Sequence, residues 1–191
     1  MIRPHAKLAI FASGNGRNAE AIMTHFKNHP DITVALLLSN NPEAFALARA
    51  EKFHVPNKVF TRTQFKGDEV LQWLKNADVT HIVLAGFLWL IPNNLLLQYP
   101  RKIVNIHPAL LPKFGGKGMY GMNVHEAVKA AGELETGITI HLVNDHFDEG
   151  EILFQARCTL TGAETPEAIA HSVYELEIAH YPAAIEKWII T

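Results

Sequence analysis

The sequence predicts an α/β protein with a doubly wound, mostly parallel central sheet, helices on both of its faces and an antiparallel C-terminal extension. In the first half, short apolar runs bounded by turn residues alternate with longer segments of helical spacing, which is the pattern of parallel strands joined by crossover helices. In the second half, apolar and polar residues alternate within the runs, as in antiparallel strands. We therefore expect one domain over residues 1–191, with an N-terminal half of about 1–100 and a C-terminal half of about 101–191.

The individual elements follow from these runs. Strands are expected at 7–12, 33–39, 81–85, 102–107, 136–143 and 151–160. Helices are expected at 18–28, 43–52 and 63–76, and a long closing helix at 165–190. Pro42 is suited to a helix start, whereas Pro182 predicts an interruption of the closing helix.

Composition narrows the function classes. The chain has 191 residues and 48% hydrophobic content, which is enough for a sizeable core. Its formal net charge of -2 offers no basic surplus for nucleic acid. Cys158 is the only cysteine, and no apolar run reaches the roughly 18 residues of a membrane span. We expect a cytoplasmic protein that binds neither membrane nor nucleic acid, and the sequence leaves open whether it is a monomer or a homodimer.

A glycine-rich turn, A-S-G-N-G-R-N at 12–18, joins the first strand to a helix. Free backbone N–H groups and the helix dipole at such a turn suit a phosphate, although a plain strand-to-helix turn is the alternative. The third glycine of the dinucleotide fingerprint is missing, and the second strand ends in L-S-N-N at 38–41, with no Asp or Glu positioned for a ribose hydroxyl. The turn therefore favours a phosphate monoester.

Two polar residues occur in the strand K-I-V-N-I-H, at 102–107. Asn105 and His107 are two residues apart, so they point to the same side at the carboxyl end of a parallel strand, where ligands bind. An amide donor beside an imidazole can stabilise an oxyanion and transfer protons near neutral pH, as acyl transfer requires. The alternative is a pair of core residues satisfied by the backbone.

A third polar cluster, H-L-V-N-D-H-F-D-E-G at 141–150, follows an apolar strand and ends at a glycine turn. Within it, Asp148 is a candidate proton carrier or orienting partner for an imidazole. A solvated acidic loop is the alternative interpretation. His25 and His29 are four residues apart, but no nearby acidic or cysteine ligand completes a metal site, and we expect none.

These segments, with L-A-G-F-L-W-L-I at 84–91 and N-I-H-P-A-L-L-P at 105–112, occur in an order and spacing that resemble the folate-dependent formyltransferases. The resemblance covers nearly the whole chain, from Lys7 to about Trp188. It implies transfer of a formyl group from 10-formyltetrahydrofolate to the amine of glycinamide ribonucleotide. The family's catalytic asparagine, histidine and aspartate match Asn105, His107 and Asp148.

The resemblance also implies two binding regions. The ribonucleotide phosphate would lie on Gly16, Arg17 and Asn18, in the N-terminal half, and Glu177 would contact the ribose. The folate would lie in two segments together with Asn105: Leu88, Trp89, Leu90 and Ile91, and Val143, Asn144, Asp145, His146, Phe147 and Asp148.

Other functions stay open at this point. The acceptor could be an amino-sugar nucleotide or an aminoacyl-tRNA, the formylfolate could be hydrolysed, or the chain could be a folate-binding module without catalysis. Arg17 and Trp89 depart from residues that many relatives carry, which bears on affinity. The glycine-rich stretch at 113–125 reads as a mobile lid or a lineage-specific connection, and we favour the lid.

Overall fold

A computed structural model describes residues 5–191, so residues 1–4 of the expected domain lie outside the described part. Its seven strands hydrogen-bond in the order β3-β2-β1-β4-β5-β6-β7. The strands are β1 (Ala6–Phe11), β2 (Ile32–Ser39), β3 (Asn57–Val59), β4 (His81–Leu84), β5 (Ile103–His107), β6 (Glu135–Leu142) and β7 (Ile152–Thr159). The chain divides into two compact units, of which the first ends at Val104 and the second spans Asn105–Thr191.

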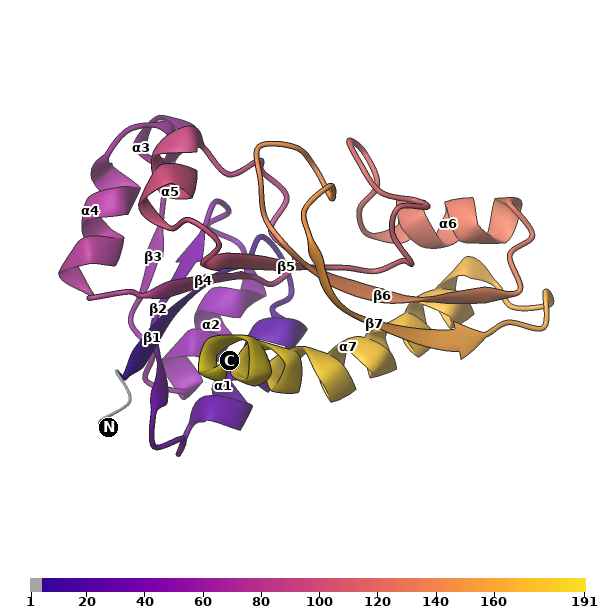
Figure 1. The fold of residues 1–191 in the computed structure, drawn as a ribbon, viewed down its shortest axis with the longest axis horizontal. Coiled ribbons are helices and arrows are strands. Elements are labelled where there is room, and N and C mark those ends of the chain that lie inside the picture. Colours follow the sequence, from indigo (N-terminus) through magenta and orange to yellow (C-terminus); the bar gives the residue numbers. More distant parts are fainter. Residues whose placement is uncertain (1–4) are drawn as a thin grey trace. The chain divides into compact units, whose positions relative to one another are not determined.

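The first unit is a parallel sheet with helices on both faces. β1 pairs in parallel with β2 and β4, and β2 pairs in parallel with β3. Figure 1 shows α1 and α2 on one face of these strands and α3, α4 and α5 on the other. Their bounds are α1 Arg17–Phe26, α2 Phe45–Lys52, α3 Arg62–Lys66, α4 Glu69–Asn76 and α5 Asn93–Gln98. The doubly wound arrangement expected from the alternation of runs is confirmed.

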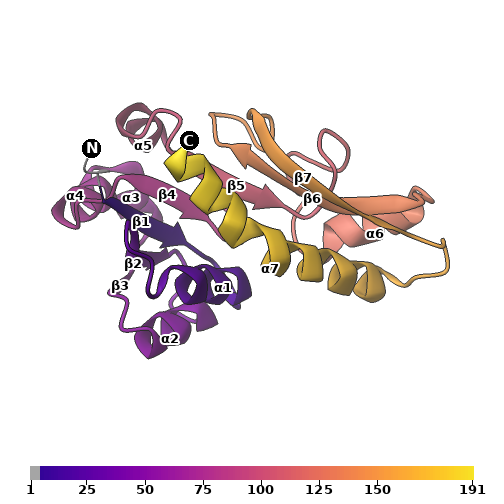
Figure 2. The ribbon, with the colours of Figure 1, turned by 60° about the horizontal axis from the view of Figure 1, so that its bottom comes forward.

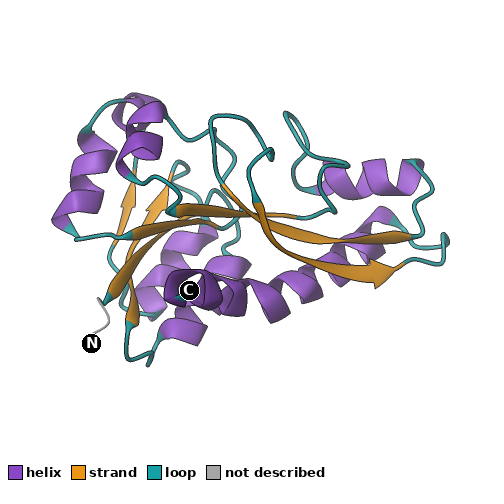
Figure 3. Ribbon diagram, in the orientation of Figure 1, coloured by secondary structure: helices purple, strands orange, loops and turns teal. Residues whose placement is uncertain are grey.

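The second unit carries the antiparallel part of the fold. β6 and β7 pair antiparallel along most of their length, and both are long, twisted strands (Figure 3). Two helices complete the unit: α6 (Met122–Ala130) and α7 (Pro166–Ile190). Figure 2 shows α7 as a long helix beside β6, β7 and α6. The predicted antiparallel extension is therefore correct.

Several element predictions were wrong in detail. The helix expected at 63–76 is two helices, because the first ends at Lys66 and the second begins at Glu69. The closing helix runs through Pro182 without the expected interruption, and the side chains of Tyr181 and Pro182 are buried. Pro42 does not start α2, whose first residue is Phe45.

Two further elements have too weak a sequence signal to be expected, the three-residue strand β3 and the six-residue helix α5. His29 lies beyond the end of α1, so it does not share a helix with His25. Among the helices of residues 5–191, none has both the length and the apolar content needed to cross a bilayer.

Candidate active site

The end of β5 presents two polar side chains. Asn105 is half-buried, and His107, two residues later, has only 3% of its surface exposed. The strand is otherwise buried, because Ile103, Val104 and Ile106 all lie in the core. The polar residues therefore occupy positions that a purely structural strand would fill with apolar side chains.

The Asp148 carboxylate lies between two histidines. Its Oδ2 is 3.4 Å from Nδ1 of His107, and its Oδ1 is 3.5 Å from Nε2 of His141. The backbone N–H of Gly116 also donates to Oδ2, at 3.0 Å. The second unit thus brings together the three predicted catalytic residues, Asn105, His107 and Asp148, although their roles stay a prediction.

His141 fixes the orientation of the Asn105 amide. Its Nδ1 lies 2.9 Å from the backbone oxygen of Leu142, which can only accept, so Nδ1 carries a proton. When Nε2 is unprotonated, it accepts from the Asn105 Nδ2 group, which lies 3.1 Å away, and the other amide hydrogen of Asn105 is left to face a ligand. When Nε2 is protonated, it faces Oδ1 of Asp148 at 3.5 Å as a donor instead.

His107 also contacts the loop that precedes α6. Its Nε2 donates to the backbone oxygen of Phe114 at 2.7 Å. Phe114 and Asp148 both have left-handed backbone, with φ of 56° and 59°. Non-glycine residues adopt that region at a cost, and such costs cluster at functional sites. Both nitrogens of His107 are therefore engaged, one by Asp148 and one by Phe114.

Burial and the carboxylate act in opposite directions on this cluster. Burial lowers the pKa of His107 below its ordinary value, with Asp148 and the Phe114 carbonyl opposing it and His141 adding to it. Burial alone would raise the pKa of Asp148, but His141, His107 and the Gly116 N–H outweigh it and the pKa is lowered. Asp148 is consequently ionised near neutral pH, as a proton acceptor must be.

His125 belongs to the same neighbourhood, which the sequence did not reveal. It lies on α6 with 6% of its surface exposed, and its buried Nδ1 has no hydrogen-bond partner among the described residues. Burial lowers its pKa, and the positive charge of His107 lowers it further. The sequence did not single out His125, because a helical position alone does not show which face of α6 is covered.

The glycine-rich turn lies in the first unit and is tightly held. Gly16 has φ of 75°, and a Cβ placed there would come within 2.5 Å of Cα of Ala46. Arg49 donates to the backbone and side-chain oxygens of Asn15, both at 2.9 Å, and pairs with Glu20. Arg17 is exposed and Asn18 half-buried. The turn thus presents its N-terminal helix end in a fixed shape.

The two segments expected to contact folate differ in character. Leu88 and Leu90 are exposed by 47% and 42%, whereas Ile91 is buried, with 3% of its surface exposed. Trp89 carries the Arg62 guanidinium 4.4 Å above its ring. In the second unit, 145–147 are exposed and 143–144 half-buried. Glu177 lies half-buried on α7, and its role in ribose binding stays a prediction.

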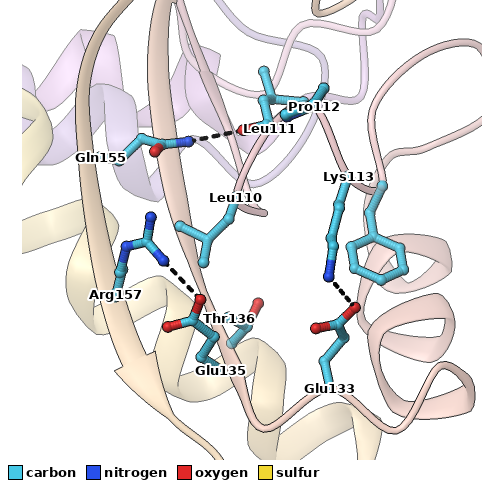
Figure 4. A pocket seen from close by; sticks show the side chains of 10 residues that line it. Leu110, Leu111, Pro112, Lys113, Glu133, Glu135, Thr136, Gln155 and Arg157 are labelled. Carbon is cyan, nitrogen blue, oxygen red and sulfur yellow. Dashed lines mark hydrogen bonds and ion pairs between the residues drawn. The ribbon is translucent and has the colours of Figure 1, made fainter.

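A separate pocket in the second unit lies along residues 110–114 (Figure 4). Two ion pairs flank it, Lys113 with Glu133 at 2.7 Å and Arg157 with Glu135 at 2.6 Å. Neither His107 nor Asp148 lines this pocket, so it is not the catalytic centre. Within residues 5–191, no group of three or more histidine, cysteine and acidic residues has the geometry to hold a metal ion.

Fold and site together define a class of protein. The chain belongs to the formyl transferase family, whose model matches residues 6–185. It is 37% identical over 187 residues to the phosphoribosylglycinamide formyltransferase of Bacillus subtilis, a match that covers 95% of this chain and 93% of that protein. The corresponding enzyme of Haemophilus influenzae is 33% identical over 189 residues, covering 95% of this chain and 86% of its own.

A solved structure agrees with these relatives. The crystal structure of glycinamide ribonucleotide transformylase 1 from Geobacillus kaustophilus matches with a TM-score of 0.88 and 34% identity, covering 97% of this chain and 99% of that chain. The resemblance inferred from the sequence motifs is therefore confirmed, and so is the fold class. The chain is a formyltransferase, and its family uses 10-formyltetrahydrofolate as co-substrate.

Proposed function

We propose that this enzyme transfers the formyl group of 10-formyltetrahydrofolate to the amine of glycinamide ribonucleotide, giving formylglycinamide ribonucleotide and tetrahydrofolate in purine biosynthesis. The observation that carries the proposal is the cluster of amide, imidazole and carboxylate formed by Asn105, His107 and Asp148. These are the three groups that acyl transfer to an amine requires. Relatives over nearly the whole chain carry the corresponding name.

The chemistry follows from the three side chains. The neutral amine of the acceptor attacks the formyl carbon, a C–N bond forms, and the formyl oxygen becomes an oxyanion. The free amide hydrogen of Asn105 and the Nε2–H of His107 donate to that oxyanion. Asp148 takes the proton that the attacking nitrogen loses, directly or through water. Collapse of the intermediate re-forms the carbonyl and breaks the bond to folate N10, which leaves with the proton that Asp148 returns, directly or through water.

The contact between His107 and Phe114 indicates what the glycine-rich stretch at 113–125, the proposed lid, does in the reaction. Nε2 of His107 donates to the Phe114 carbonyl, so that nitrogen is occupied when no ligand is bound. To reach the formyl oxygen, Nε2 must exchange this carbonyl for the ligand, which requires residues around Phe114 to move. The glycines at 115, 116, 118 and 121 supply a backbone suited to such motion.

The acceptor and the folate use different parts of the chain. The phosphate of glycinamide ribonucleotide binds the turn at Gly16, Arg17 and Asn18, and the ribose hydroxyls of the same substrate contact Glu177. The N–H groups of Leu90 and Ile91 have no hydrogen-bond partner among the described residues, which supports their use in reading the pterin edge. The segment from Val143 to Asp148 supplies the other side of the folate site. No metal is required, and the cytoplasmic location expected from the sequence belongs to this proposal.

Comparison of acceptors tests the proposed substrate. Tetrahydrofolate release from 10-formyltetrahydrofolate should be rapid with glycinamide ribonucleotide and far slower with glycinamide riboside, which lacks the phosphate. Arg17→Ala should narrow that difference by raising the KM for the ribonucleotide alone. Equal rates with both acceptors would contradict the phosphate site, and formate release without an amine acceptor would instead indicate a hydrolase.

A further inference from the structure

Ser13 occupies a junction between the two ligand-binding segments of the first unit. It is buried, with 9% of its surface exposed, and is the second residue of the glycine-rich turn that follows β1. The proposed phosphate contacts begin three residues later, at Gly16. Its polarity is therefore not explained by contact with solvent, and every polar group it carries must find a partner inside the protein.

The hydroxyl of Ser13 makes two hydrogen bonds to different segments. It donates to Oδ1 of Asn40, at the end of β2, over 2.7 Å. It accepts from the backbone N–H of Leu88, in the proposed folate segment, over 3.2 Å. The hydroxyl oxygen of Ser13 is thus held in place by Asn40, and it in turn holds Leu88, the first residue of the folate segment.

The backbone of Ser13 strengthens this junction. Its N–H donates to the carbonyl of Gly86 at 3.1 Å, and its carbonyl accepts from Nδ2 of Asn41 at 3.2 Å. All the hydrogen-bonding groups of one residue are therefore used, two of them by residues 86–88. The N–H of Leu88 is consumed by the hydroxyl and is not available to read a folate ring.

We propose that Ser13 is a positioning residue that couples the two ligands, so that occupation of the folate segment tightens binding of the phosphorylated acceptor, and the reverse. The coupling runs from 88–91 through the Leu88 N–H and the Ser13 hydroxyl to the turn at 14–18. A ligand that orders either segment lowers the cost of ordering the other, because both are tied to one side chain. This inference rests on the proposed function, since it takes its two ligands from there.

The test uses a pair of ligands that cannot react with each other, tetrahydrofolate and glycinamide ribonucleotide. Isothermal titration calorimetry measures the affinity of the full-length protein for glycinamide ribonucleotide without and with saturating tetrahydrofolate. In the wild-type protein, we expect saturating tetrahydrofolate to increase the affinity for glycinamide ribonucleotide by about five-fold or more, which is the lower end of the usual coupling between two sites. In Ser13→Ala this ratio should fall towards one.

Asn41→Ala is the matched control, because the Asn41 side chain hydrogen-bonds to the Ser13 carbonyl and to the N–H of Glu43 and not to the folate segment. Asn41→Ala should lower the affinity for glycinamide ribonucleotide in both titrations and leave the ratio of the two affinities unchanged. A merely structural Ser13 would behave like Asn41. Ser13→Cys, whose thiol is a weaker donor and acceptor, should give an intermediate ratio and serves as the readout if Ser13→Ala does not fold.

The outcomes separate this inference from the proposed function. A wild-type ratio of one, or a Ser13→Ala ratio equal to that of the wild type, would overturn the coupling while leaving the proposed function intact. Failure of the wild-type protein to bind either ligand alone would overturn the proposed function itself, and the coupling with it.

Discussion

The carboxylate of Asp148 lies 3.4 Å from Nδ1 of His107, and its second oxygen lies 3.5 Å from His141. An Asp148→Asn substitution keeps the shape of the side chain but removes its negative charge. That charge accepts the amine proton in the proposed mechanism, and it also raises the pKa of His107. We expect kcat to fall on the order of 100- to 10,000-fold. Glu149→Gln is the control, because Glu149 is an exposed carboxylate beside Asp148 that lies outside the proposed folate segment, and this variant should retain nearly full activity.

Asn105→Ala should lower turnover more than substrate affinity. The amide donates to charge that develops only in the transition state, and loss of one such donor typically costs on the order of 100- to 1,000-fold in kcat. Steady-state kinetics with both substrates separates kcat from KM. A rise in KM with unchanged kcat would rule out the oxyanion role of Asn105.

His141→Ala should also lower kcat, by about ten-fold, the equivalent of one net hydrogen bond. The reason is that Asn105 Nδ2 loses the acceptor that fixes its orientation. His141→Gln offers an amide oxygen as a replacement acceptor and should restore part of the activity. If the glutamine variant is no better than the alanine variant, His141 acts through Asp148 rather than through Asn105.

Gly16→Ala should damage the phosphate turn. A methyl group there would come within 2.5 Å of Cα of Ala46, on a backbone with φ of 75° that disfavours side chains. We expect a lower melting temperature and a KM for the acceptor raised at least several-fold. Gly14→Ala is the matched control, since a Cβ at Gly14 meets nothing within 4 Å. Equal behaviour of the two variants would argue against a shape requirement at Gly16.

His81 predicts acid sensitivity of the fold. Burial, with a smaller contribution from Lys102, lowers its pKa from 6.5 to about 4. Below pH 6.5, His81 of the unfolded chain therefore binds a proton, whereas His81 of the folded chain stays unprotonated. The free energy of unfolding consequently falls as the pH drops from 6.5 towards 4. Urea unfolding at several pH values should show a shallower loss in His81→Gln. An identical pH dependence in both proteins would exclude His81 as a source.

The fold could be predicted from the sequence wherever the apolar pattern was strong. Six strands were expected within about one residue of their observed ends, because buried parallel strands are apolar on both faces. The break at Gly67 was missed because the helical spacing continues across it. The continuity of α7 at Pro182 was missed because tertiary packing overrides a local preference, which a sequence pattern does not contain.

The site shows the same division. Asn105, His107 and Asp148 stood out as polar residues at strand ends, and the structure brings them together. His141, His125 and Ser13 did not stand out, because their importance lies in contacts between segments distant in the sequence. For His141 the available signal was its place on a buried strand seven residues before Asp148. For Ser13 the sequence offers only a serine in a turn, which is an ordinary position for it.

The central claim is that Asn105, His107 and Asp148 form the catalytic centre of a glycinamide ribonucleotide formyltransferase. The most direct measurement is the rate of formylglycinamide ribonucleotide formation from 10-formyltetrahydrofolate by the wild-type protein, His107→Ala and Asp148→Asn, with folding checked by circular dichroism. The account predicts rapid formation by the wild-type protein and near-complete loss in both folded variants. Wild-type turnover that survives either substitution would contradict the catalytic assignment, and absence of wild-type turnover would contradict the substrate.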